Sequence, residues 1–120
     1  MTSLDWVEEF PGAITVCDPT GIILAMNAKA AQGFVAEGGK ALLGSNLLAC
    51  HPEPARAHLQ QMLETQQANV YTIEKNGAHK LIYQTPWYQG GAYAGFVELS
   101  LVLPAALATL PHFVRTPKVE

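Results

Sequence analysis

The sequence predicts an α+β domain in which a five-stranded antiparallel sheet has short helices packed on one face. Two strand-like runs open the domain on either side of a tight turn at 18–21. Helical segments follow within 28–67, and three more strand-like runs close the domain between 69 and 103. Strands joined by such short turns must be antiparallel. Helices placed between two groups of strands are typical of an architecture that gathers them on one side of the sheet.

Composition limits the class of protein. A chain of 120 residues suits one domain with one core, and 49% hydrophobic residues are too many for a disordered chain. Only 14% of residues are charged, which an oligomer surface or a lipophilic cavity would explain. The seven Lys and Arg residues are scattered, so we expect no nucleic-acid partner. No apolar run approaches the ~20 residues of a membrane span and no signal pattern opens the chain, which predicts a cytoplasmic protein without membrane contact.

The first part of the chain predicts a helix and a hairpin. A short helix is expected over 4–9, before Pro11. Strands are expected over 13–17 and 22–26. The Asp-Pro-Thr-Gly sequence at 18–21 supplies the turn between them, because Asp bonds the backbone ahead, Pro presets φ and Gly accepts positive φ.

The middle of the chain predicts helices. Asn27 is a favourable N-cap for a helix over 28–34. Short helical turns are expected over 41–43 and 46–50, and the longest helix over 54–67. The apolar face of this longest helix has i, i+3, i+4 spacing and consists of Leu59, Met62 and Leu63.

The last part of the chain predicts the meander. Strands are expected over 70–74 and 79–85, with Asn76-Gly77 as a type I′ hairpin turn between them. Residues 87–91 are interpreted as a connection, and 92–103 as the last strand. We therefore divide the chain into a flanking helix (1–12), a domain (13–103) and a C-terminal tail (104–120) that begins with a short helix.

Short motifs in this order resemble the PAS family of sensor and interaction domains. The segment 14–21 followed by Asn27 is similar to the opening hairpin of that family, 43–48 is similar to a helix start, and 95–100 is similar to its closing strand. The resemblance covers roughly 4–103. It implies signal transduction: PAS domains detect a small molecule, a cofactor, light or redox state, or they dimerise, usually beside an effector domain or protein.

A ligand pocket is expected between the sheet and the helices of 28–67. Its occupant would be a small apolar or mixed ligand, because few charges are available to line it. The same residues could equally form a filled core in a purely structural dimerisation module. The predicted lining consists of Ile14, Val16, Met26, Leu47, Leu59, Met62 and Leu63.

Two histidines raise the alternative of a haem sensor, since such a PAS domain uses one histidine as the axial ligand. His58 lies on the longest predicted helix and His51 precedes Pro52. The competing interpretation is a packed or solvent-facing His58 and a His51 that hydrogen-bonds the backbone. No cofactor is evident otherwise, and no metal site is expected.

The predicted N-terminal helix has an apolar side formed by Leu4, Trp6 and Val7. A short amphipathic helix outside the sheet must bury that side somewhere. The resemblance to PAS domains implies a homodimer interface here, together with the outer face of the sheet.

A small enzyme is the remaining alternative, and we expect no enzymatic activity. The sequence has no catalytic triad order and no phosphate-binding glycine loop. An enzyme of this shape would need a buried carboxylate or a Tyr/Asp pair in its cavity, and nothing in the sequence places one there. Glu98 alternates with Val97 and Leu99 and therefore faces the opposite side of the sheet from them.

Overall fold

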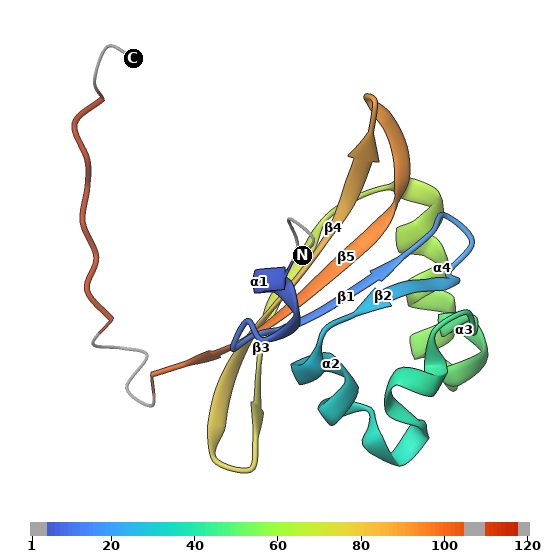
Figure 1. Cartoon of the computed structure of the whole chain (residues 1–120). Coiled ribbons are helices and arrows are strands. Elements are labelled where there is room, and N and C mark those ends of the chain that lie inside the picture. Colours follow the sequence, from blue (N-terminus) through green and yellow to red (C-terminus); the bar gives the residue numbers. More distant parts are fainter. Residues whose placement is uncertain (1–4, 105–109, 118–120) are drawn as a thin grey trace.

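The computed structural model of the chain describes residues 5–104 and 110–117. Its centre is a five-stranded antiparallel sheet with the order β2-β1-β5-β4-β3 (Figure 1). This confirms the predicted fold class and places β5 at the centre, between β1 and β4. The strands are β1 (Ala13–Cys17), β2 (Ile23–Met26), β3 (Asn69–Lys75), β4 (Ala78–Gln89) and β5 (Ala92–Leu103).

The helices between β2 and β3 gather on one face of the sheet, as predicted (Figure 1). A separate short helix, α1 (Asp5–Glu8), precedes the sheet. The helices on the covered face are α2 (Ala28–Gly33), η1 (Val35–Glu37), η2 (Gly39–Leu42), α3 (Leu47–Cys50) and α4 (Ala55–Thr65).

The turn between β1 and β2 is held by the side chain of Asp18. Its Oδ1 accepts hydrogen bonds from the backbone N–H groups of Thr20 at 2.9 Å and Ile22 at 3.0 Å, and from the Thr20 hydroxyl at 2.8 Å. Slight burial alone would raise the pKa of Asp18, but these hydrogen bonds lower it below its ordinary value. This confirms the predicted role of the turn residues.

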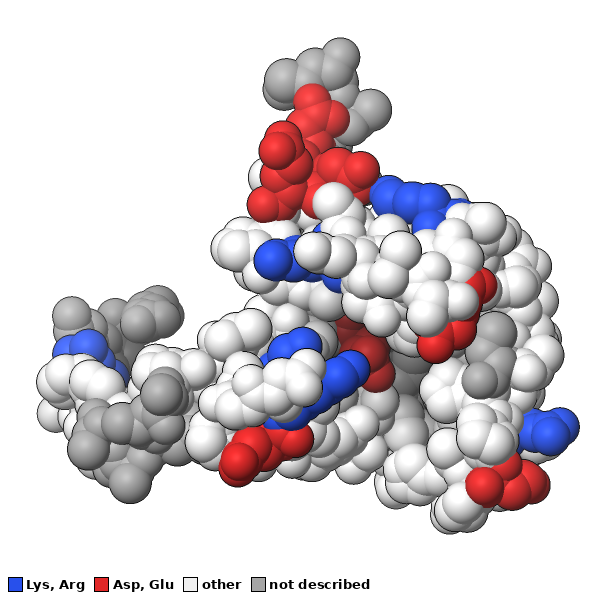
Figure 2. Space-filling view, turned by 90° about the horizontal axis from the view of Figure 1, so that it is seen from below, with Lys and Arg blue, Asp and Glu red and all other residues white. Residues whose placement is uncertain are grey.

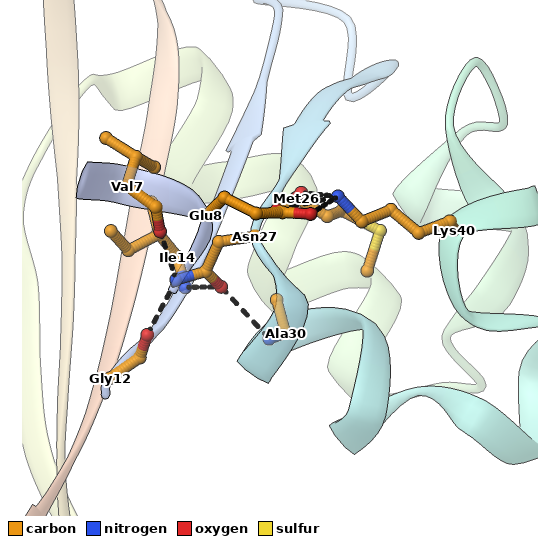
Figure 3. Close-up of polar contacts among 8 residues, drawn as sticks. All are labelled: Val7, Glu8, Gly12, Ile14, Met26, Asn27, Ala30 and Lys40. Atoms are coloured by element: carbon orange, nitrogen blue, oxygen red, sulfur yellow. Dashed lines mark hydrogen bonds and ion pairs between the residues drawn. The ribbon is translucent and has the colours of Figure 1, made fainter. Parts of the chain in front are cut away.

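Asn27, between β2 and α2, is a polar hub (Figure 3). Its Oδ1 accepts from the N–H of Ile14 at 2.9 Å and of Ala30 at 3.0 Å, so it is the predicted N-cap and also a tie to β1. Its Nδ2 donates to the carbonyls of Val7 at 3.0 Å and Gly12 at 2.8 Å. The side chain is fully buried. One residue therefore joins the end of α1, the entry to β1 and the start of α2.

A second contact holds α1 from the side of η2. The ammonium group of Lys40 lies 3.0 Å from a carboxylate oxygen of Glu8 and donates to the Met26 carbonyl at 2.7 Å (Figure 3). Lys40 thus ties α1 to the end of β2, close to the Asn27 hub.

Helix α4 presents the predicted apolar face to the sheet. Met62 and Leu63 are buried against Cys17 and Phe96, and Leu59 packs beside them. The helix ends at Gln66, whose φ of 58° is left-handed. The hydroxyl of Tyr93 donates to the Leu63 carbonyl at 3.0 Å, which ties the end of α4 to β5. A second core cluster lies under α2 and consists of Ile23, Met26 and Ala30.

The meander differs from the prediction in one place. Asn76 and Gly77 form the predicted turn, with φ of 53° and 77°. Residues 87–91 are not a loose connection: β4 continues to Gln89, and Gly90-Gly91 alone makes the next turn. Trp87 and Tyr88 therefore belong to the sheet, where they pair with Gly95 and Tyr93.

The tail after β5 contains no helix within 110–117, a segment that is exposed. The predicted short helix therefore does not lie in this segment, and 105–109 lie outside the described residues. No helix in the described part of the chain is long and apolar enough to cross a bilayer.

Candidate functional site

A cavity of about 100 Å³ lies between the inner face of the sheet and the helices. Its polar floor consists of Thr15, Gln84 and Glu98, on three neighbouring strands. Its apolar walls are Phe34, Leu47, Leu59, Met62 and Phe96. An apolar pocket with a few convergent polar groups is the usual form of a small-molecule site. This cavity is smaller than the apolar cavity of about 150 Å³ that holds benzene.

Strand register places the polar floor in one row. Thr15 of β1 pairs with Glu98 of β5, Glu98 pairs with Gln84 of β4, and Gln84 pairs with Asn69 of β3. Paired residues project on the same face of a sheet. Four polar side chains thus cross the inner face in a line, which we call the polar row.

Hydrogen bonds run along the polar row in one direction. Asn69 Nδ2 donates to Gln84 Oε1 at 3.1 Å, and Gln84 Nε2 donates to Glu98 Oε2 at 2.7 Å. Because the bond to Asn69 fixes which end of the Gln84 amide carries the oxygen, the amide hydrogens of Gln84 must point toward the carboxylate. The chain of hydrogen bonds from Asn69 through Gln84 therefore ends at an acceptor, the Glu98 carboxylate.

The hydroxyl of Tyr71 on β3 interacts electrostatically with the Glu98 carboxylate. Burial raises the pKa of Tyr71, the negative charge of Glu98 raises it further, and a hydrogen bond with Gln84 lowers it. Burial likewise raises the pKa of the Cys17 thiol, more than its backbone hydrogen bond lowers it, and the negative charges of Asp18 and Glu98 raise it too. Cys17 is therefore a buried neutral thiol in the cavity wall.

A wider open cleft of about 560 Å³ adjoins the cavity and shares Thr15, Phe34 and Glu98 with it. Its rim carries lysines from α2 and from the β3–β4 hairpin, namely Lys29, Lys75 and Lys80. Figure 2 shows basic side chains on both sides of this hollowed face, with acidic atoms between them. The cleft is therefore positive at its rim and carries the carboxylate of Glu98 inside.

The predicted pocket residues separate into two groups. Leu47, Leu59 and Met62 line the cavity. Met26 and Leu63 are buried in the two core clusters. Ile14 and Val16 do not line this cavity, because side chains alternate along β1 and Thr15 and Cys17 face it instead.

The two histidines lie in different settings. His51 lines the cavity, and its Nδ1 is 2.7 Å from the Leu47 carbonyl, which agrees with the backbone-bonding interpretation. His58 is exposed, and its Nε2 lies 3.4 Å from the Asn69 amide, outside the cavity lining. The cavity of about 100 Å³ that His51 lines is smaller than the roughly 300 Å³ at which sites for drug-sized ligands begin, and neither histidine lines the wider cleft.

The predicted dimer residues lie at the N-terminal end of the domain. Leu4 is outside the described residues. Trp6 is 62% exposed and meets Phe10 edge to face, and Val7 is half-buried. Within the described residues, the outer face of β4 and β5 carries apolar side chains that are not buried. They are Leu81, Tyr83, Val97, Leu99 and Leu101.

The polar row is the feature that the sequence analysis missed. The alternation of Glu98 with Val97 and Leu99 correctly predicts its face, but the sequence alone does not show that this face borders the cavity. The register of β5 with β1 supplies the missing information, because it brings Glu98 beside Thr15. Among the described residues, no cluster of His, Cys, Asp and Glu could hold a metal ion.

Comparison with known proteins identifies the family. The sequence profile of the PAS fold matches residues 7–103, whereas no curated protein matches the chain. A domain of an HTR-like protein from Haloarcula marismortui is a similar solved structure, at 20% identity and a TM-score of 0.53, with 78% of this chain and 99% of that chain covered.

Two structures from Vibrio cholerae are also similar. The Aer2 receptor, a dual PAS-haem oxygen sensor, matches at 16% identity and a TM-score of 0.54, covering 78% of this chain and 95% of that one. The VqmA dimer matches at 16% identity and a TM-score of 0.65, and the match covers 99% of this chain and 59% of VqmA. At these identities the likeness shows the fold, and the profile match shows the family. The chain belongs to the PAS fold family.

Proposed function

We propose that this PAS domain senses a small ligand bound in the cavity between the sheet and helices α3 and α4. The single observation that carries the proposal is the cavity itself, with apolar walls and a polar floor at the centre of the sheet. Three of the residues proposed to contact the ligand were expected from the sequence: Leu47, Leu59 and Met62. The bound state would be passed to an effector domain or partner protein, and the setting would be cytoplasmic.

We further propose that the domain forms a homodimer through the outer face of β4 and β5 together with α1. Two observations favour this: the exposed indole of Trp6, and the apolar side chains on the outer face of β4 and β5, which are not buried. Buried apolar area is the main favourable term in association. The similar VqmA structure is a dimer, which is consistent with the proposal.

Native mass spectrometry of the chain, purified from a heterologous host, tests both proposals. We expect a dimer whose mass exceeds that of two polypeptides by a small adduct. Leu59→Trp fills the cavity from α4, so this variant should lose the adduct and stay dimeric. Gln60→Trp places the same side chain on the exposed side of α4 and should keep the adduct.

Each outcome has a distinct meaning. An adduct that persists in Leu59→Trp would contradict the cavity proposal, and a monomer would contradict the dimer proposal. An adduct with the mass of haem would support the alternative in which His51 or His58 is the axial ligand. It would also show that the cavity volume does not exclude haem. Chemical turnover of a bound small molecule would favour the small-enzyme alternative, because Glu98 supplies one carboxylate in the cavity lining within the described residues.

A further inference from the structure

The carboxylate of Glu98 has unused acceptor capacity. A carboxylate offers about four lone-pair sites. Within the described part of the chain, Glu98 accepts one hydrogen bond, from Gln84, and forms no ion pair. Acceptor sites of this half-buried group therefore remain free where it borders the cavity.

The hydrogen bonds of the polar row leave the remaining acceptor sites of Glu98 free. The Gln84 amide is held by Asn69 on one side and donates to one oxygen of Glu98 on the other. The bond to Oε2 fixes the carboxylate in place, and Gln84 bonds to one of its two oxygens only. A carboxylate held by a neutral donor keeps its negative charge unpaired, and an unpaired charge beside apolar walls favours a donor arriving from the cavity.

We infer that the cavity recognises a small ring molecule through an N–H or O–H group that donates a hydrogen bond to Glu98. This inference rests on the proposed function. The apolar walls of Phe34, Leu59 and Phe96 suit the ring of such a ligand, and parts that exceed the cavity of about 100 Å³ would extend into the adjoining cleft, which Glu98 also lines. An anionic group at the same place would face the charge of Glu98 and is excluded from the class.

The test uses two probes of equal size, aniline and toluene, on the intact chain at pH 7, where aniline is neutral. Titrations followed by ¹H–¹⁵N NMR should shift the backbone amide signals of Thr15, Cys17 and Glu98 with both probes. A hydrogen bond to a charged group contributes enough for aniline to bind roughly tenfold more tightly than toluene. Glu98→Gln keeps the side-chain shape without the charge and should reduce that preference to less than about threefold. The matched control, Glu64→Gln on the exposed side of α4, should keep it.

The outcomes separate this inference from the proposed function. Equal affinity of the wild-type chain for aniline and toluene would overturn the role of Glu98 and leave the cavity proposal standing. Binding of neither probe would overturn both. The wild-type comparison decides the question even where Glu98→Gln fails to fold.

Discussion

Replacing Gly95 with alanine is expected to destabilise the domain more than a glycine-to-alanine substitution at any other described position. A Cβ atom at this position would lie 1.9 Å from the Cys17 carbonyl oxygen and 2.8 Å from the backbone of Asp18. Backbone atoms on a neighbouring strand cannot swing aside as a flexible side chain can. The φ of Gly95, +130°, is also strained for any residue with a side chain. Together, overpacking and backbone strain should cost about 3 kcal/mol or more.

The position of Gly95 explains why the approach is so close. It pairs with Trp87 where the register of β4 and β5 shifts. The indole N–H of Trp87 donates to the same Cys17 carbonyl at 3.0 Å. The end of β1 is thus held between the glycine and the indole, and added bulk at Gly95 would also weaken that hydrogen bond.

Urea unfolding measures the effect, with Gly33→Ala as control. Nothing lies within 4 Å of a Cβ built at Gly33, at the end of α2, so alanine there should leave the unfolding midpoint unchanged or raise it slightly. Equal unfolding midpoints for Gly95→Ala and Gly33→Ala would contradict the close approach of Gly95 to the Cys17 carbonyl.

Replacing Asn27 with alanine is expected to have the second-largest effect. Four hydrogen bonds disappear together, two accepted and two donated. Their backbone partners include groups in the interior that water cannot easily reach, and each such group left unsatisfied costs about 1–3 kcal/mol. We expect a loss of about 3 kcal/mol in the free energy of unfolding, even if part of the site relaxes.

Asn46→Ala provides the matched comparison. Asn46 also caps a helix, accepting from the Leu48 N–H at 2.8 Å, and donates to the Thr20 carbonyl at 3.1 Å. Because Asn46 is only half-buried and makes two bonds, its loss should cost about 1 kcal/mol. Asn27→Asp keeps the acceptor but turns a buried carboxylate oxygen toward the Val7 and Gly12 carbonyls, so it should cost at least as much as Asn27→Ala. Equal unfolding midpoints for Asn27→Ala and Asn46→Ala would contradict the hub role of Asn27.

Local chemistry made the fold largely predictable. The Asp18 turn, the Asn27 cap and the Asn76-Gly77 turn each have a residue type that one local conformation requires, and each lies where the sequence predicts it. The spacing of Leu59, Met62 and Leu63 likewise predicts the face of α4 correctly. The predicted connection at Trp87 and Tyr88 is wrong, because strand residues next to a two-glycine turn resemble a loop in sequence.

The cavity was less predictable, because apolar character does not distinguish the two faces of this sheet. Ile14 and Val16 are more apolar than Thr15, yet Thr15 faces the cavity. The outer face is apolar as well, so hydrophobicity points to both sides. Only the pairing of distant strands shows that Thr15, Gln84 and Glu98 meet, and a single sequence without its fold does not contain that pairing.

The central position of β5 has a consequence for how a signal could leave this domain. Glu98 and Leu99 are consecutive residues of one strand, and they point to opposite faces. The first lies in the cavity and the second on the uncovered apolar surface. Under the proposed function, a ligand that moves this strand would change the shape of the opposite surface directly. The path from cavity to partner would then be a single peptide bond, and no relay of side chains across the domain would be needed.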